Sequence, residues 1–278
     1  VRATYDLLVA LLEEINARPR ALLDAVSTSE AAVVARARAT DAARDVVLAT
    51  DSASTNAPFL YKGIATTWEK SDITGARIAR YGSAPVDIEV PLLRETRATV
   101  VVRQPAGYLV PQEWTVCRDR MDLHGVRYRR FAQAWTDSVE VARVVEWKPG
   151  DLAEGHRAIQ VTRVVLEHRL RTFHPGDLWV PLDQPGATLA MQLFEAQAPD
   201  GLMRWNYFDT AFEFKEYSED YVMEPIARRM MADDPALARE FQARLAADSA
   251  FARSPRSRID FFYRRSPWTD PMQNLHPV

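Results

Sequence analysis

The spacing of apolar residues changes along this chain, and that change restricts the fold more than any other feature of the sequence. Residues 1–50 carry apolar side chains at helical spacing, among them Leu8, Leu11 and Ile15. Residues 51–104 contain short apolar runs separated by Gly, Ser, Pro and Asn, a pattern typical of antiparallel strands. Helix-like and strand-like segments that are segregated in this way predict an α+β fold.

The N-terminal segment, residues 1–50, is predicted to be helical. Its first helix carries a leucine-rich face, and we expect that face to be buried. Ser27 and Glu30 have the spacing of a capping box, which predicts the start of a second helix that ends near Ala49. The polar run at residues 51–58 then marks a boundary with a small β-rich region, residues 51–104.

The remainder, residues 105–278, is predicted to be an α+β C-terminal domain that ends in a helical cluster. We expect a helix after Pro111 that stops at Gly125, strands at 138–147, 157–172 and 178–182, and a helix at 187–194. The second of these strands is long enough to predict a bulge or bend. A helix at 212–231 should kink or restart at Pro225. Asp234 before Pro235 and Ser254 before Pro255 each predict a helix start.

Charge and cysteine content exclude several classes of protein. The 38 acidic and 35 basic residues are interspersed and leave a net charge of −3, which is not the footprint of a nucleic-acid binder. No apolar run approaches the ~20 residues of a membrane-spanning helix. Cys117 is the single cysteine, so the chain can form neither an internal disulfide nor a cysteine-based metal site.

The motifs of common active sites are not found in the sequence. None of the 5 histidines begins an HxxE or HExxH pattern, so a self-contained zinc site is unsupported. No GxSxG elbow, phosphate-binding loop or dinucleotide fingerprint occurs. Cys117 lies about two helical turns before His124, and a buried structural thiol is the favoured interpretation of it. The chain is therefore expected to contain no cofactor.

A few residues are candidates for binding a substrate or partner. His174 precedes Pro175 and Gly176, which places it in a turn. The acidic and aromatic stretch at 212–221 could bind a cation or a basic peptide, or it could be an amphipathic helix with its acids outward. The candidate site residues are His174, Trp205, Glu213, Glu216 and Tyr217.

Large aromatic side chains allow two interpretations. Trp205, Tyr207 and Tyr217 could line an open groove for a peptide or a glycan. The favoured alternative is a buried core that contains Tyr108, Trp179, Trp205, Phe208, Phe212, Phe241 and Phe262.

Several stretches together resemble one family. They are GYLVPQEW (107–114), GDLWVPLDQP (176–185), LFEAQAPDGLMRWNYFD (193–209), FEFKEYSEDYVMEPIA (212–227) and RIDFFYRRSP (258–267). In this order they resemble the bacterial carboxypeptidase A-like zinc metallopeptidases that carry a long C-terminal extension. Residues 1–15 resemble the final helix of the peptidase domain of such enzymes.

The resemblance implies that the chain is an accessory C-terminal region of a zinc carboxypeptidase. In the family an HxxE motif and a later histidine bind zinc, and a glutamate handles the protons of peptide hydrolysis. No residue of this chain matches these groups, which would precede Val1, so the chain alone is expected to be inactive and the zinc to lie in the parent enzyme. Because the first residue is not methionine, we expect the chain to start inside a longer protein.

The partner implied by the resemblance is the N-terminal peptidase domain of the same parent chain, with a peptide or cell-wall substrate as a further partner. Periplasmic or secreted localisation follows from the same resemblance. The alternative functions are an independent hydrolase, with a site assembled from His168, His174, Asp177 and Glu213, or a protein- or glycan-binding module.

Overall fold

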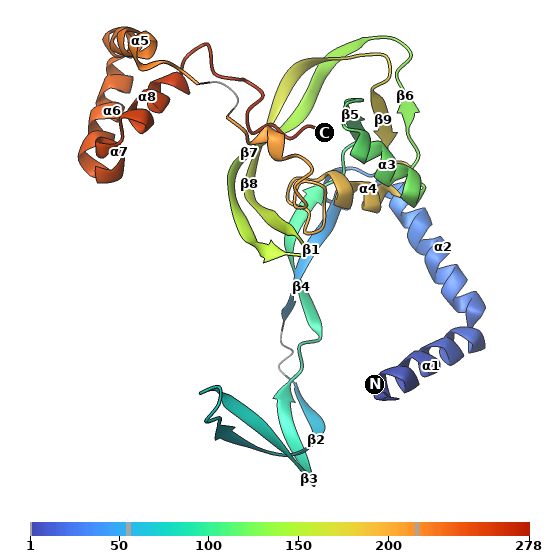
Figure 1. Ribbon diagram of the computed structural model, residues 1–278. Coiled ribbons are helices and arrows are strands. Elements are labelled where there is room, and N and C mark those ends of the chain that lie inside the picture. Colours follow the sequence, from blue (N-terminus) through green and yellow to red (C-terminus); the bar gives the residue numbers. More distant parts are fainter. Residues whose placement is uncertain (1, 54–56, 215–216) are drawn as a thin grey trace. The chain divides into compact units, whose positions relative to one another are not determined.

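A computed structural model describes residues 2–53, 57–214 and 217–278, and its elements form an α+β fold (Figure 1). The helices are α1 (Arg2–Ala17), α2 (Pro19–Arg36), α3 (Thr115–His124), α4 (Ala187–Phe194), α5 (Asp220–Asp233), α6 (Pro235–Ala247), α7 (Ser249–Arg253) and α8 (Pro255–Tyr263). The strands are β1 (Asp45–Ala53), β2 (Pro58–Lys70), β3 (Arg77–Pro91), β4 (Glu95–Arg103), β5 (Gly107–Val110), β6 (Arg129–Arg130), β7 (Trp135–Ala153), β8 (His156–Phe173) and β9 (Leu178–Pro181). The predicted fold class, with N-terminal helices and a C-terminal helical cluster, is confirmed.

The chain divides into two compact units that alternate along the sequence. The first comprises the described residues of Val1–Leu109, Trp114–Arg130 and Leu178–Gly201. The second comprises those of Val110–Glu113, Phe131–Asp177 and Leu202–Val278.

In the first unit, the second helix starts earlier than the capping box at Ser27 predicts. Pro19 occupies the first position of α2, where its missing N–H removes no helical hydrogen bond and its fixed φ suits the helix. Ser27 therefore lies inside α2, and the predicted start is wrong. The predicted end near Ala49 is also wrong, because β1 begins at Asp45.

Strand β1 occupies the residues expected to end that helix, and its apolar residues alternate in burial. Val46 and Leu48 are buried, whereas Val47 between them is exposed. β1 pairs with β4 in antiparallel register, with Val46 opposite Val102. β2 and β3, which lie between them in sequence, pair with each other in the same antiparallel sense. The antiparallel pairing predicted for the β-rich region is thus confirmed.

The core of the first unit is formed by α3, α4 and a three-stranded sheet of order β5-β9-β6. α4 has the predicted bounds, and its Met191 and Phe194 are buried. α3 ends as predicted at Gly125, whose left-handed φ of 69° suits a residue without a side chain. Gly107 of β5 packs so closely against β9 that a Cβ atom there would lie 2.5 Å from a ring carbon of Trp179.

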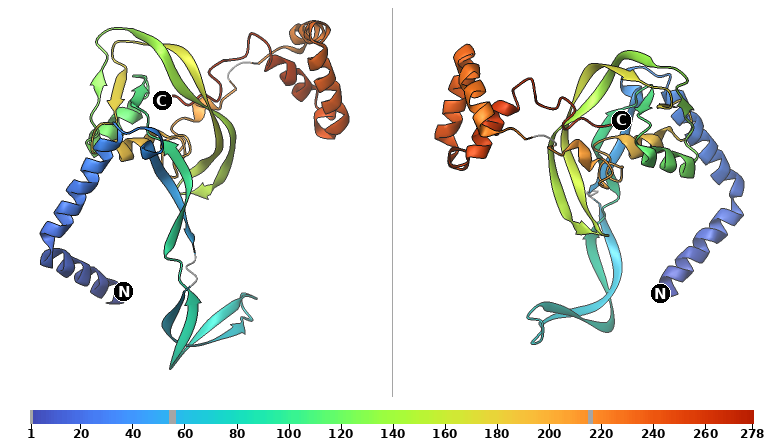
Figure 2. Two further views of the ribbon diagram at one scale, coloured as in Figure 1. Left: turned by 180° about the vertical axis from the view of Figure 1, so that it is seen from behind. Right: turned by 45° about the horizontal axis from the view of Figure 1, so that its top comes forward.

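The second unit contains a long twisted hairpin of β7 and β8, which both views in Figure 2 show. Its loop residues, Glu154 and Gly155, both have positive φ, as a type I′ turn requires. β7 is longer than the strand predicted at 138–147. The register of the hairpin shifts at three places between Val144 and Leu152. The extra residues lie on both strands, so the irregularity predicted for β8 affects β7 as well.

The second unit also contains the C-terminal helical cluster, α5 to α8. The carboxylate of Asp234 accepts backbone N–H groups at the start of α6, and the Ser254 hydroxyl does the same at α8, so both predicted helix starts are confirmed. The helix predicted at 212–231 begins only at Asp220, and Pro225 lies inside it. Among the described helices of the chain, none has the length and apolar character needed to cross a membrane.

The predicted aromatic core is correct for Tyr108, Phe208, Phe241 and Phe262, which are buried. It is wrong for Trp179, Trp205 and Phe212, which are half-buried. The rings of Trp205 and Phe212 each contact a ring of the hairpin, His156 for the first and Trp147 for the second. Contact with an exposed hairpin covers one side of a ring and leaves the other side accessible.

Candidate functional site

His174 lies in the turn between β8 and β9, as its neighbours predict. Its backbone N–H donates to Asp177 Oδ2 at 2.7 Å, and the backbone N–H of Gln112 donates to Asp177 Oδ1 at 2.9 Å. Asp177 is only 4% exposed, whereas the His174 side chain is exposed. Both carboxylate oxygens are thus used to hold the turn together, which assigns Asp177 a structural role.

The structure does not bring His168 and His174 together. His168 is an exposed residue of β8, and His174 follows the last residue of that strand. At ~3.3 Å per residue, six positions of extended chain separate them by roughly 20 Å. One metal ion or one substrate bond cannot be reached by both imidazoles.

The remaining predicted site residues follow α4 and precede α5 in the sequence. The Trp205 ring meets His156 edge-on, with the ring centroids 5.7 Å apart. Glu213 is exposed, Tyr217 is 72% exposed, and Glu216 lies outside the described residues. Within the described part of the chain, no group of three His, Cys, Asp or Glu side chains could hold a metal ion.

Cys117 is a buried residue of α3 and lacks the environment of a nucleophile. Its side chain is fully enclosed, and burial raises the pKa of the thiol to about 12. The thiolate that would attack a substrate is therefore not formed at neutral pH. The structural interpretation of this residue agrees with its place in the core.

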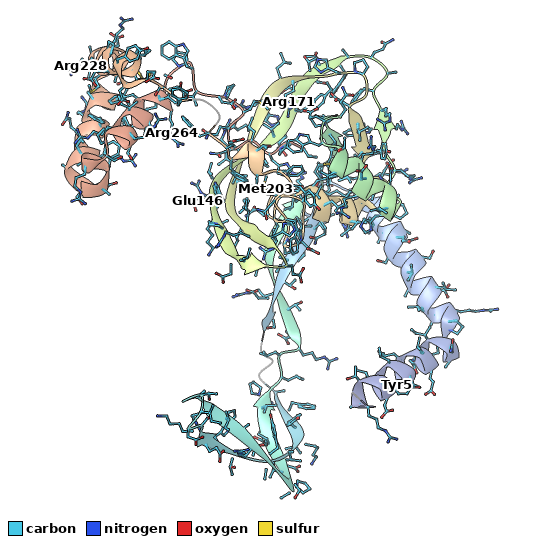
Figure 3. All side chains as sticks on the ribbon, viewed as in Figure 1. Tyr5, Glu146, Arg171, Met203, Arg228 and Arg264 are labelled. Atoms are coloured by element: carbon cyan, nitrogen blue, oxygen red, sulfur yellow. The ribbon has the colours of Figure 1, made fainter. Side chains whose placement is uncertain are left out.

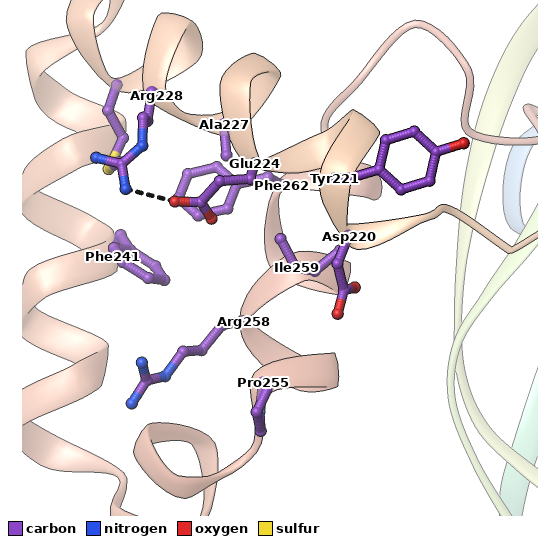
Figure 4. A pocket seen from close by; sticks show the side chains of 11 residues that line it. Asp220, Tyr221, Glu224, Ala227, Arg228, Phe241, Pro255, Arg258, Ile259 and Phe262 are labelled. Carbon is purple, nitrogen blue, oxygen red and sulfur yellow. Dashed lines mark hydrogen bonds and ion pairs between the residues drawn. The ribbon is translucent and has the colours of Figure 1, made fainter.

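A cavity of about 530 Å³ lies within the helical cluster (Figure 4). Phe241, Ile259 and Phe262 form its apolar part. Glu224 and Arg228, one turn apart on α5, form an ion pair at its edge. The sequence analysis missed this cavity; the one local signal was the i,i+4 spacing of that pair, which is common on exposed helices.

The most extensive uncovered apolar surface of a described helix is on α1. Tyr5, Leu8 and Leu12 lie along one side of α1 and are 66%, 55% and 61% exposed, and Tyr5 is labelled in Figure 3. Leu7, Leu11 and Ile15 widen the same face, which we call the α1 face. None of the described residues of α1 is buried, so the expectation that this chain buries the face is wrong.

Comparison of the chain with models of protein families, with curated proteins and with solved structures finds no match. The resemblance to carboxypeptidase A-like enzymes therefore stays a prediction.

Proposed function

We propose that this chain is a non-catalytic accessory region of a zinc carboxypeptidase that acts in the periplasm or outside the cell. In this proposal the α1 face packs against the peptidase domain of the same parent chain. The exposed α1 face is the observation that supports it. The peptidase domain is proposed as the partner because residues 1–15 resemble its last helix.

The energetics of the α1 face favour a covering partner. Complete burial of one exposed leucine side chain stabilises the buried state by roughly 1.5–3 kcal/mol. Leu8 and Leu12 each keep more than half of their surface in solvent, and four further large apolar side chains of α1 do the same or nearly so. An amphipathic helix of this kind gains its stability from the surface that covers its apolar side.

The use of the polar candidates also supports an accessory role. Asp177 binds two backbone N–H groups, and strand geometry keeps His168 away from His174. Asp177 therefore holds a turn, and the two histidines face solvent at separate places. The proposal assigns peptide hydrolysis to the parent's peptidase domain and attachment to this chain.

The α1 face can be tested with two matched double variants of the full-length gene product. Leu8→Glu/Leu12→Glu places two charges on the α1 face, and Ala10→Glu/Ala17→Glu places two on the opposite side of α1, where both alanines are exposed. We expect the leucine variant to lower the melting temperature and the peptidase activity of the full-length enzyme, and the alanine variant to leave both unchanged. In the isolated chain neither variant should lower the melting temperature, because the face is already in solvent. Equal behaviour of the two variants in the full-length enzyme would overturn the proposal.

Peptidase activity provides an independent test. The isolated chain, with zinc added, should release no C-terminal amino acid from peptides. Chelator-sensitive release by the purified chain would show that the region is catalytic and would end the accessory proposal.

A further inference from the structure

The last eight residues of the chain, 271–278, lie along the edge of β7 and are called the C-terminal strap here. The backbone N–H of Val144 donates to Asn274 O and that of His276 donates to Ala142 O, both at 2.8 Å. Arg143, between these two β7 residues, forms an isolated antiparallel bridge with Leu275. The strap is thus a short added strand that two backbone hydrogen bonds join to the hairpin.

An arginine clamp holds the first part of the strap. Arg143 donates to the carbonyl oxygens of Gln273 at 2.6 Å and Pro271 at 3.2 Å, and Arg169 donates to Pro271 O at 3.2 Å. Glu167 accepts from both guanidinium groups and fixes their orientation. These contacts lie in a half-exposed region and leave the end of the strap to be held by other residues.

His276 anchors the end of the strap in an apolar site. It is 2% exposed, its neighbour Leu275 is 3% exposed, and its ring meets the edge of the buried Phe208 ring at a centroid distance of 5.2 Å. Nδ1 lies 2.9 Å from Val278 O and 3.2 Å from Val278 N. Nε2 is buried without a hydrogen-bond partner among the described residues.

The unpartnered Nε2 makes this site selective for the neutral imidazole. A neutral ring can place its lone pair or its one remaining N–H at Nε2 at the cost of a single unsatisfied group. A protonated ring carries N–H donors at both nitrogens and a full charge, and the site offers Nε2 no acceptor. Protonation is therefore much less favourable in the closed strap than in solvent.

We propose that the C-terminal strap is an acid-sensitive latch, held on β7 by neutral His276 and released when the imidazole takes up a proton from solvent. One proton is bound for each strap that opens. Release uncovers the outer edge of β7 and the Phe208 side chain. The inference does not depend on the proposed carboxypeptidase role.

The pH range of the latch follows from the pKa of His276. Burial lowers this pKa from 6.5 to about 4, against a smaller opposing effect of the Val278 hydrogen bond. Because the pKa is lower in the closed state, the closed strap is most stable above pH 6.5 and loses stability as the pH falls towards 4. The equilibrium constant for opening then rises about tenfold per pH unit, and roughly 300-fold in total.

The charged groups nearest the strap do not set the pKa of His276. Arg143, Glu167 and Arg169 form the clamp, Asp270 accepts the N–H of Met272 at the start of the strap, and Asp209 follows Phe208 in the chain. No charged side chain contributes to the shift of the His276 pKa. Hydrogen bonds from Arg143 lower the pKa of Glu167 below 4.5, so its charge persists between pH 6.5 and 5.

Hydrogen–deuterium exchange of the complete chain tests the latch. Protection factors of the strap amides are measured from pH 7.5 to 4.5 and corrected for the intrinsic pH dependence of exchange. The wild-type protein should lose protection about tenfold per pH unit below pH 6.5. His276→Phe, which fills the apolar site and cannot titrate, should show no such slope, and His124→Gln at the exposed end of α3 should behave like wild type.

Two results would overturn the proposal: a wild-type protection factor that does not change with pH, or an equal slope in His276→Phe. If the phenylalanine variant does not fold, an NMR titration of the His276 imidazole in the wild-type protein decides. An imidazole that titrates above pH 6 while the strap stays closed excludes the latch, and one that titrates well below pH 6 supports it.

Discussion

Replacement of Asp177 by alanine should destabilise the second unit strongly, although the residue stands in a turn. Its two carboxylate oxygens accept the backbone N–H groups of Gln112 and His174 at 2.9 and 2.7 Å, and the residue is 4% exposed. Alanine removes both acceptors and adds none. The two amides then lose their partners in a part-buried place, where water replaces them only in part.

The size of the effect follows from the number of hydrogen bonds lost. A hydrogen bond to a charged group contributes about 1.5–3 kcal/mol, so two of them give an upper range of about 3–6 kcal/mol. Partial access of water to the turn moves the expected loss to the lower end, about 3 kcal/mol. Asp177→Asn keeps one acceptor oxygen and should cost about half as much.

Urea denaturation followed by tryptophan fluorescence measures these changes in the free energy of unfolding. Asp183→Ala is a matched control, because Asp183 is an exposed carboxylate six residues away, and it should stay within about 0.5 kcal/mol of wild type. If Asp177→Ala also stays within that range, the two backbone hydrogen bonds do not hold the turn and the structural role assigned to Asp177 is refuted.

Three further predictions concern the cores of the two units. Phe208→Ala should cost about 3–5 kcal/mol by urea denaturation, and Trp205→Ala clearly less because that ring is half-buried, so equal costs would contradict the burial of the two rings. Cys117 should not react with a thiol reagent at pH 8 until the chain unfolds, since its thiol is enclosed and its pKa is raised to about 12; rapid labelling of the native chain would contradict this. Gly107→Ala should lower the free energy of unfolding by about 1–3 kcal/mol in a thermal melt. The added Cβ atom would lie 2.5 Å from both a ring carbon of Trp179 and the backbone oxygen of Val180, so an unchanged melting temperature would contradict this close approach of β5 and β9.

Local interactions explain why parts of the fold were predictable. Asp234 and Ser254 cap the helices that follow them through side-chain bonds to N–H groups two or three residues away, so the sequence contains both partners of each bond. The same holds for Gly125 at the end of α3. Pro19 is an equally local signal for the start of α2, and the prediction from the capping-box spacing at Ser27 overlooked it.

Pairing between distant strands explains why residues 45–49, predicted to be helical, form a strand. Residues 45–49 contain valine and leucine next to an alanine-rich helix, and helix and strand are both compatible with so short an apolar run. The partner strand β4 lies about fifty residues later and supplies the hydrogen bonds of β1. The hairpin likewise extends beyond the predicted strands, because most of the added residues of β7 find a partner on β8.

The candidate site was less predictable than the fold. The sequence placed His174 in a turn correctly but could not show that Asp177 is occupied by backbone amides or that His168 is a strand's length away. It identified the apolar side of α1 but not that the chain leaves it in solvent. The burial of His276 beside Phe208 had no sequence signal at all.

By itself the sequence determined the α+β class, the helix caps and the apolar face of α1, because each depends on residues within a few positions of one another. Only the tertiary structure decided which side chains are enclosed, which carboxylates are already bound and which imidazole has lost its solvent. Those properties depend on the residues that another part of the chain brings into contact, and a one-dimensional pattern of residue types does not contain that information.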